Sequence, residues 1–593
     1  MAWTTRMKAR ASWARQSMSS KSHKYLTMPF QSMPVSEHPP KLPVRILKNV
    51  MIPMRDGVRL CSDIYLPKRE ATYPTILTRL PYGKREWSTS EPVKGKFWAR
   101  RGYAYVAQDV RGKFKSEGIW EPFVNETNDG YDTIDWITKQ SWCDGRIGIA
   151  GFSYMGYTSL ATAVSGHPNL VCAAPGMTAA DIHGVWMYKG GPFCLQTMGG
   201  WLIGEEHKRS QNDLLLDYWH LPLISLGEAA GLKDKHYRHY IEHPRRDAFW
   251  DRINLSNGLE RISIPMLHMG GWYDVFLKGT IETWREATAR AGGVARNNQW
   301  LLIGPDDHGS TQLKSGRIGN LEIGKSKVDY EVEAMVRFFD YWLKGVDNGY
   351  QSTKRVKFFV VGDNVWREEV AWPPDRMKLT SYYLHSGGKA NTMDGDGRLS
   401  LEPPSSEPSD SYTYDPGNPV RQSVDENLWY LGQFMKDRSQ TELRPDVLIY
   451  TSAAVLSDLE ITGRISLVLH VSSTSDETDF MAKLLDVFPD GYAHMIQEGA
   501  LRLSSISSVK AGHVRAPGTP LEHEIDLTAS SYVVKVGHKI RLEVSSSDFN
   551  RYDRNLNISG EFGKGSKHGI AEQTIYHDSE HPSRMILPIV PRA

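Results

Sequence analysis

The residues Ile147–Gly156, Ile-Gly-Ile-Ala-Gly-Phe-Ser-Tyr-Met-Gly, constrain the fold of this chain more than any other stretch. Their apolar first half predicts a short buried strand, and residues 154–163 predict the start of a helix. Glycines two residues before and three residues after Ser153 permit a sharp turn that lifts the serine hydroxyl clear of the sheet. Glycines near a serine also occur in ordinary tight turns, so a catalytic reading of Ser153 requires a base, an acid and an oxyanion donor elsewhere.

Strands and helices alternate on both sides of this turn. A hairpin is expected at 44–66, strands at 73–80, 104–109, 264–269 and 300–303, and helices at 129–138 and 328–344. Such alternation predicts an α/β core with a largely parallel sheet that helices cover on both faces.

Changes in composition and hydrophobic pattern along the sequence divide the chain further. Tryptophans among short amphipathic pieces predict a helical cap inserted into the core, and short alternating runs near the C-terminus predict an all-β jelly roll. The expected boundaries are a basic leader or tail at 1–40, the core at 41–175 and 256–350, the cap at 176–255 and the jelly roll at 351–593.

The first 36 residues contain no Asp or Glu but several Arg and Lys. This composition favours a solvated tail and leaves an organelle-targeting leader as the alternative. No stretch of 18 apolar residues occurs, so no membrane partner is expected. Four cysteines without C-x-x-C spacing indicate buried free thiols in a reducing compartment, and we expect a cytoplasmic protein.

The charge balance also excludes some partners. A formal net charge of +2 over 593 residues argues against a nucleic-acid binder. Neither a phosphate-binding loop nor a paired metal-ligand run is apparent, so neither a cofactor nor a metal is expected. The sequence leaves open whether the chain forms a homo-oligomer.

Two further residues follow apolar strands as Ser153 does. Asp274 follows the strand near 264–269, and His308 follows the strand at 300–303. The carboxyl ends of parallel strands meet at one edge of a sheet, and the order Ser, Asp, His is that of α/β-hydrolases. A histidine would take the serine proton and a carboxylate would hold the imidazole in the right tautomer. We therefore predict the catalytic triad Ser153, Asp274 and His308.

These histidines and acids also allow other assignments. His308 lies beside Asp306 and Asp307 and could be a surface ion-pair histidine, but a separate strand end gives Asp274 the better approach to its ring. His268 lies within an apolar strand, which is typical of a core histidine.

An oxyanion hole needs two donors. The backbone N–H of Tyr154, directly after the serine, is one candidate. The loop after residues 75–80 should supply the other, and it carries Tyr82, whose phenol can donate. A structural turn tyrosine is the alternative.

Several motifs together resemble the cocaine-esterase-like hydrolases, a group related to X-Pro dipeptidyl peptidases, glutaryl acylases and α-amino-acid ester hydrolases. The resemblance spans about residues 43–590 and rests on Leu80–Tyr82, Gln108–Gly112, Gly151–Gly156, Gly271–Asp274, Gly304–His308, Asp458–Gly463, Thr478–Lys483 and Ser545–Asn555. It implies an α/β-hydrolase core with an inserted helical cap and a C-terminal jelly roll. It also implies an oxyanion hole formed by the Tyr82 hydroxyl and the Tyr154 N–H.

The same resemblance bears on the substrate. It places Trp186, Trp201 and Phe276 near an acyl pocket, which favours a bulky apolar or aromatic acyl group, although core packing would also explain these rings. Phe276 and Leu277 stand where α-amino-acid ester hydrolases carry an acidic pair, so recognition of a substrate ammonium is not expected. No N-terminal dimerisation domain of the X-Pro peptidase kind is evident.

These observations predict a cofactor-free serine hydrolase that cleaves a small-molecule ester, or less readily an amide, through an acyl-enzyme. The alternatives are an acyltransferase with the same intermediate, an X-Pro type peptidase, and a non-catalytic protein that binds through its jelly roll. The intact triad residues argue against the last of these.

Overall fold

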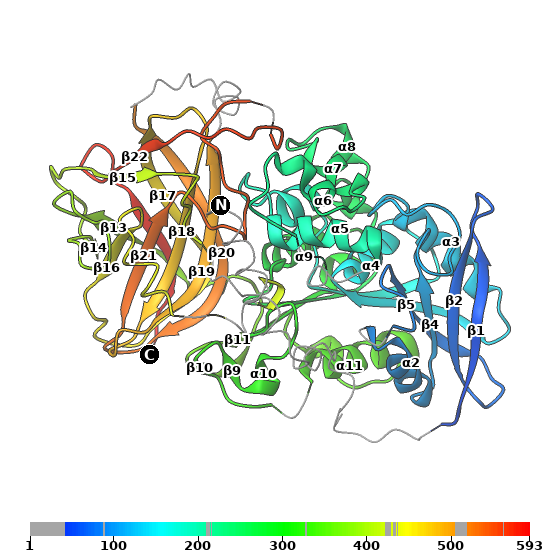
Figure 1. Cartoon of the computed structure of the whole chain (residues 1–593). Coiled ribbons are helices and arrows are strands. Elements are labelled where there is room, and N and C mark those ends of the chain that lie inside the picture. The colour runs from blue at the N-terminus through cyan, green and yellow to red at the C-terminus, as the bar shows by residue number, and fades with distance from the viewer. Residues whose placement is uncertain are drawn as a thin grey trace.

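The computed structural model describes residues 42–592, apart from 87–88, 209–213, 215, 327–328, 422–427, 431–434, 436, 504–518 and 561. The expected basic leader at 1–40 therefore lies outside the described residues. Two bodies lie side by side, with an α/β core on one side and an all-β domain on the other (Figure 1).

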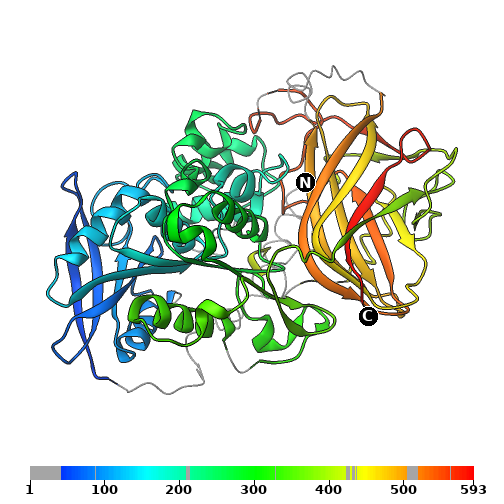
Figure 2. The same ribbon diagram turned by 180° about the vertical axis from the view of Figure 1, so that it is seen from behind.

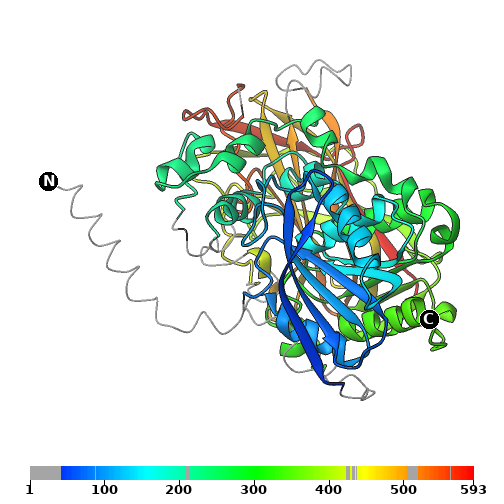
Figure 3. The same ribbon diagram turned by 90° about the vertical axis from the view of Figure 1, so that its right-hand side faces the viewer.

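The core is built on a ten-stranded mixed sheet with the order β1-β2-β4-β3-β5-β6-β7-β8-β11-β12. Strands β4 to β11 of this order run parallel, and the hairpin β1–β2 adds antiparallel strands at the edge nearest the viewer in Figure 3. The strands are β1 (Val44–Pro53), β2 (Arg59–Pro67), β3 (Tyr73–Leu80), β4 (Ala104–Asp109), β5 (Cys143–Phe152), β6 (Leu170–Gly176), β7 (Met266–Gly271), β8 (Gln299–Gly304), β11 (Val356–Val360) and β12 (Val365–Glu369).

Helices cover both faces of this sheet, as the sequence predicts for an α/β fold. On one face lie α2 (Glu91–Arg100) and α11 (Tyr330–Lys344), and on the other lie α3 (Glu126–Thr138), α4 (Tyr154–Val164) and α9 (Leu277–Arg290). Helix α11 shows the local cause: Val332, Met335, Phe338, Phe339 and Leu343 are buried at helical spacing. The helix begins at an Asp329 cap, whose carboxylate accepts the Val332 N–H, and ends at Gly345 with φ 71°.

A run of short helices is inserted between β6 and β7, where the cap was expected. These are η4 (Ile182–Met187), η5 (Leu195–Gly199), α5 (Gly200–His207), η7 (Leu223–Ser225), α6 (Leu226–Ala229), α7 (Lys235–Ile241), α8 (Ala248–Asp251) and η8 (Leu255–Arg261). They lie over the sheet on the side that faces the all-β domain (Figure 1).

One expected boundary differs from the structure. The sequence predicts the end of the core at residue 350, but β11 pairs in parallel with β8, and β12 pairs with β11. Both strands therefore extend the core sheet, and the all-β domain begins only at β13 (Lys378–His385). A short alternating run has the same pattern in either sheet, so its period does not tell which sheet it joins.

The C-terminal domain is an all-β jelly roll of mostly antiparallel strands, with one parallel pair, β14 and β16, and the reverse view shows it in yellow-green to red (Figure 2). Its strands after β13 are β14 (Arg398–Ser400), β15 (Asp410–Tyr414), β16 (Leu448–Ser452), β17 (Leu459–Ser473), β18 (Thr478–Val487), β19 (Ala493–Leu503), β20 (Leu521–Val534), β21 (Lys539–Ser545), β22 (Ala571–Tyr576) and β23 (Arg584–Val590). Within the described residues, no helix is long and apolar enough to cross a membrane. All four cysteines are buried and unbridged, as predicted.

Candidate active site

Ser153 occupies the strained turn that its glycines predict. It lies between β5 and α4 with φ 62° and ψ −127°, a backbone conformation that side-chain-bearing residues rarely adopt. Its N–H donates to the Gly176 carbonyl at 3.0 Å. A Cβ on Gly151 would clash with Met155, and one on Gly156 would lie 2.5 Å from the Gly176 oxygen. Both glycines are therefore required for the turn.

Asp274 and His308 meet at the same edge of the sheet. His308 Nδ1 lies 2.7 Å from Asp274 Oδ1, and the Asp274 side chain is fully buried. A carboxylate can only accept, so Nδ1 carries the proton and Nε2 is the basic nitrogen of the neutral ring.

The neighbouring acids have other partners. The carboxylate of Asp306 accepts from the Gln312 N–H and the Tyr330 hydroxyl, and that of Asp307 accepts from the Gly309 N–H. His268 is buried and bonded to Gln299, and burial lowers its pKa to about 4. It is a neutral core histidine, as predicted.

The Tyr82 hydroxyl lies near Ser153 and the Trp201 indole, and both groups act on its pKa. An indole N–H can only donate, so the phenolic proton stays available for Ser153 Oγ or an atom that replaces it. Burial, and then the nearby Glu205 carboxylate, raise the pKa of Tyr82, so the phenol stays protonated. Tyr82 is therefore a protonated phenol beside the serine.

Tyr154 begins helix α4, where a backbone N–H has no partner within its own helix. Its side chain is fully buried, donating to the Glu126 carboxylate and accepting from the Phe123 N–H at 2.8 Å. These bonds hold the first turn in place, so the amide after Ser153 has a fixed direction.

The three rings predicted for an acyl pocket form one cluster beside these groups. Trp186 stacks on Phe276 with ring centroids 4.0 Å apart, and Trp201 lies 6.2 Å from Trp186. Phe276 also meets the His308 ring edge-on at 5.3 Å. Since Trp201 lies near Tyr82 and Tyr82 near Ser153, the cluster extends from the serine side to the histidine. All three rings are buried.

Comparison with known proteins places this arrangement in a family. Residues 56–310 match the family described as X-Pro dipeptidyl-peptidase (S15 family), and residues 348–586 match its C-terminal non-catalytic domain. Cocaine esterase from Rhodococcus sp. (strain MB1 Bresler) is 35% identical over 582 residues, covering 92% of this chain and 99% of that protein. The chain belongs to the cocaine-esterase-like family of serine hydrolases.

Solved structures agree with the cocaine-esterase-like fold. An α-amino acid ester hydrolase superposes with a TM-score of 0.78 at 25% identity, covering 97% of this chain and 100% of that one. An aminopeptidase from a marine sediment Thaumarchaeota archaeon superposes with a TM-score of 0.79 at 24% identity, covering 94% and 98%, and at that identity shows the fold alone.

Sequence reasoning missed one residue of this cocaine-esterase-like site. Trp429, from the all-β domain, lies 4.8 Å from the His308 ring and 5.8 Å from Phe276. Its helix η11 (Leu428–Tyr430) contacts η5 of the cap. The sequence signal for Trp429 is an aromatic residue within a polar loop. This signal does not indicate which domain the loop contacts.

A second Ser/His/Asp cluster lies inside the jelly roll. Asp410 Oδ2 contacts both Ser386 Oγ and His577 Nε2, and all three residues are buried. Because acid and serine share one imidazole nitrogen, the ring cannot relay a proton between them. This cluster is structural.

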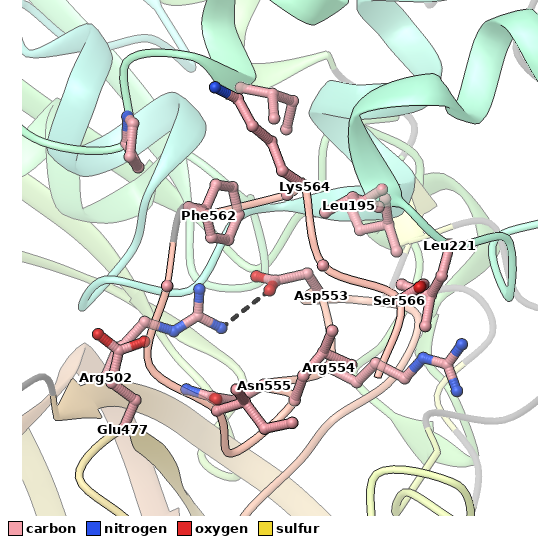
Figure 4. Close-up of a pocket in the computed structure, with 18 of the residues that line it drawn as sticks. Leu195, Leu221, Glu477, Arg502, Asp553, Arg554, Asn555, Phe562, Lys564 and Ser566 are labelled. Atoms are coloured by element: carbon pink, nitrogen blue, oxygen red, sulfur yellow. Dashed lines mark hydrogen bonds and ion pairs between the residues drawn. The ribbon is translucent and has the colours of Figure 1, made fainter. Parts of the chain in front are cut away.

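A cavity of about 1050 Å³ lies apart from Ser153, between the cap and the all-β domain (Figure 4). Arg502 and Asp553 form an ion pair on its wall, and Phe562 and Leu195 supply apolar surface. None of the predicted site residues lines it.

Proposed function

We propose that this cocaine-esterase-like protein is an esterase that hydrolyses carboxylic esters with a bulky apolar or aromatic acyl group through an acyl-enzyme on Ser153. The hydrogen bond between His308 Nδ1 and Asp274 Oδ1, at the strand edge that also holds Ser153, carries this proposal. It is the arrangement that makes a serine hydroxyl nucleophilic at neutral pH.

In the first half-reaction, Ser153 Oγ attacks the ester carbonyl carbon while His308 Nε2 takes the hydroxyl proton. Negative charge develops on the carbonyl oxygen, and the Tyr82 O–H and Tyr154 N–H are the donors proposed to receive it. The carbonyl re-forms as the alcohol leaves with the proton from His308. Water then repeats the sequence on the acyl-enzyme and releases the acid and free Ser153.

The aromatic cluster supports the acyl preference. Trp186 stacks on Phe276, and Trp201 lies tilted beside Trp186, so an acyl group bound among these buried rings would meet apolar surface that suits an aromatic or branched group. Directly after Asp274 the chain continues with Val275, and Phe276 and Leu277 are buried and apolar, so no carboxylate stands there to bind an ammonium. We therefore place esters without a free amino group ahead of peptides and amino-acid esters.

Labelling with a fluorophosphonate, followed by peptide mapping, tests the nucleophile. We expect label on Ser153, none on Ser153→Ala, and slow labelling of His308→Ala. Ser386→Ala is the matched control and should label as wild type does, because Ser386 is buried in the jelly roll. Label on another residue with activity retained in Ser153→Ala would overturn the proposal.

A panel of p-nitrophenyl and anilide substrates tests the substrate class. We expect benzoyl and branched acyl esters to have higher kcat/KM than acetyl esters and far higher than anilides. Including alcohol acceptors separates hydrolysis from acyl transfer, and an X-Pro anilide tests the peptidase alternative. A best substrate with a free N-terminal ammonium would contradict the proposed class.

A further inference from the structure

The loop that carries Asp274 is fastened by the jelly roll. Gln497, on β19, donates from Nε2 to the Trp272 carbonyl at 2.8 Å, and the Tyr273 hydroxyl bonds to His494 Nε2 at 3.2 Å. These partners contact the two residues directly before Asp274. The domain whose family description calls it non-catalytic therefore reaches the acid of the proposed triad.

The cap also makes a hydrogen bond to the loop that carries Asp274. Lys189 follows η4, and its ammonium donates to the carbonyl of Val275, the residue after Asp274. The next residue, Gly190, accepts the Arg502 N–H of β19 at 2.8 Å. Lys189 thus lies at the junction of the three parts of the molecule.

The charges around Asp274 indicate that Lys189 could balance its carboxylate. Asp274 Oδ1 is bonded to His308, whereas Oδ2 is buried and has no hydrogen-bond partner among the described residues. Asp274, Lys189 and Lys278, together with Glu498 and Arg551 of the jelly roll, line a cavity of about 150 Å³ that we call the rear cavity. An ionised carboxylate in such surroundings needs a nearby cation.

The other cations of the rear cavity are already engaged. Arg551 pairs with Glu498 at 2.5 Å, and Glu498 also pairs with Lys483. Lys278 pairs with Asp526 at 3.1 Å. Lys189 has no carboxylate within ion-pair distance in the described part of the chain. Burial lowers the pKa of its ammonium, and the Asp274 carboxylate is among the charges that oppose this shift. Lys189 is the cation left to balance Asp274.

We propose that Lys189 is a positioning residue for the reaction: it holds the Asp274 loop through the Val275 carbonyl and balances the carboxylate that orients His308. This inference rests on the proposed function. It also assigns the docking of the jelly roll a role in the geometry of the triad, because β19 fixes the cap turn that carries Lys189.

The test compares Lys189→Met, which removes charge and donor, with Lys189→Gln, which keeps a donor for Val275. We expect Lys189→Met to lower kcat about 10- to 100-fold with little change in KM, by analogy with the loss of groups that orient metal ligands. Lys189→Gln should lose less. The matched control is Lys278→Met, which removes a lysine from the outer side of the same cavity and should change kcat less than threefold.

A spectroscopic readout separates positioning from a merely structural role. The His308 Nδ1 proton, shared with Asp274, should give a downfield proton resonance that is absent in Asp274→Asn. We expect Lys189→Met to shift or broaden it while the melting temperature stays within a few degrees. Should Lys189→Met fail to fold, Lys189→Gln makes the same comparison.

The resonance is measured in a Ser153→Ala background, so it does not depend on activity. Activity retained in Ser153→Ala would defeat the proposed function and leave the resonance test standing. An unchanged resonance together with wild-type kcat in folded Lys189→Met and Lys189→Gln would defeat the inference about Lys189 alone.

Discussion

The Tyr82 hydroxyl lies near Ser153 and the Trp201 indole. An indole N–H can only donate, so the phenolic proton is left for Ser153 or for an oxyanion beside it. We predict that Tyr82→Phe lowers kcat about 10²- to 10³-fold, the usual effect of removing one oxyanion donor, and changes KM little. Steady-state kinetics on a p-nitrophenyl ester measure both constants.

Tyr73→Phe is the matched control for this variant. Tyr73 stands at the opposite end of β3 and donates to the Arg69 carbonyl at the surface, so its loss should leave kcat within twofold. Equal kcat for Tyr82→Phe and wild type would show that the phenol does not act on the reaction.

For individual site residues, the sequence predicts those that follow the ends of strands but not those whose place depends on how the domains pack. Ser153, Asp274 and His308 each follow a parallel strand, and parallel strands end at one edge whatever the rest of the chain does. The approach of Trp201 to Tyr82 requires the cap to be folded over the sheet. Trp429 reaches His308 from the all-β domain, a placement that no local pattern encodes.

Among the elements, the turn between β5 and α4 is tightly packed around its glycines. Gly156 faces the backbone oxygen of Gly176 at the end of β6, and this oxygen accepts the Ser153 N–H. A methyl group on Gly156 would therefore push on the end of β6 and disturb its hydrogen bond to the serine. We predict that Gly156→Ala costs about 1–3 kcal/mol of unfolding free energy, as overpacking does, and lowers kcat because Ser153 moves. Urea unfolding and ester kinetics measure the two effects.

Gly292→Ala provides the comparison for the turn. Gly292 has φ −91°, and an added Cβ would have its nearest contact at 3.7 Å, so stability and kcat should match wild type. Wild-type stability in Gly156→Ala would mean that the helix can shift without cost.

The loop that carries His308 is held against α11 by buried acids. Burial raises the pKa of Asp306 to about 6, from an ordinary value near 4. The folded chain then binds this proton more tightly than the unfolded chain, so the contribution to stability is complete below about pH 4 and is lost as the pH rises to about 6.

Asp306→Asn removes that titration. We predict that the difference in Tm, variant minus wild type, rises between pH 4.5 and 6.5 and is constant above pH 7. Scanning calorimetry across this range measures it, with the exposed Asp394→Asn as a control whose difference stays flat. A flat difference for Asp306→Asn as well would show that Asp306 titrates normally in the folded chain.

For the whole molecule, the sequence predicts a core, a cap and a jelly roll but does not predict how these three parts pack together. The period of each strand and helix is local, whereas the docking of the jelly roll depends on side chains far apart in the chain. Trp272 and Tyr273 of the core are buried in one hydrophobic cluster with Phe358, Leu484 and Tyr532, the last two from the jelly roll. Phe549 and Tyr552 of the jelly roll belong to the cluster of the cap.

Shared clusters make the two bodies one unit of stability. Separating them would expose Trp272, which is buried and donates to the Phe359 carbonyl, and would free the loop of Asp274. We therefore predict a single thermal transition, with equal calorimetric and van't Hoff enthalpies where unfolding is reversible. Tyr532→Ala should lower the Tm of that transition without splitting it, whereas Leu456→Ala, at a residue 95% exposed, should leave it unchanged. Two resolved transitions, with esterase activity surviving the first, would show that the jelly roll unfolds independently and that the triad does not need it.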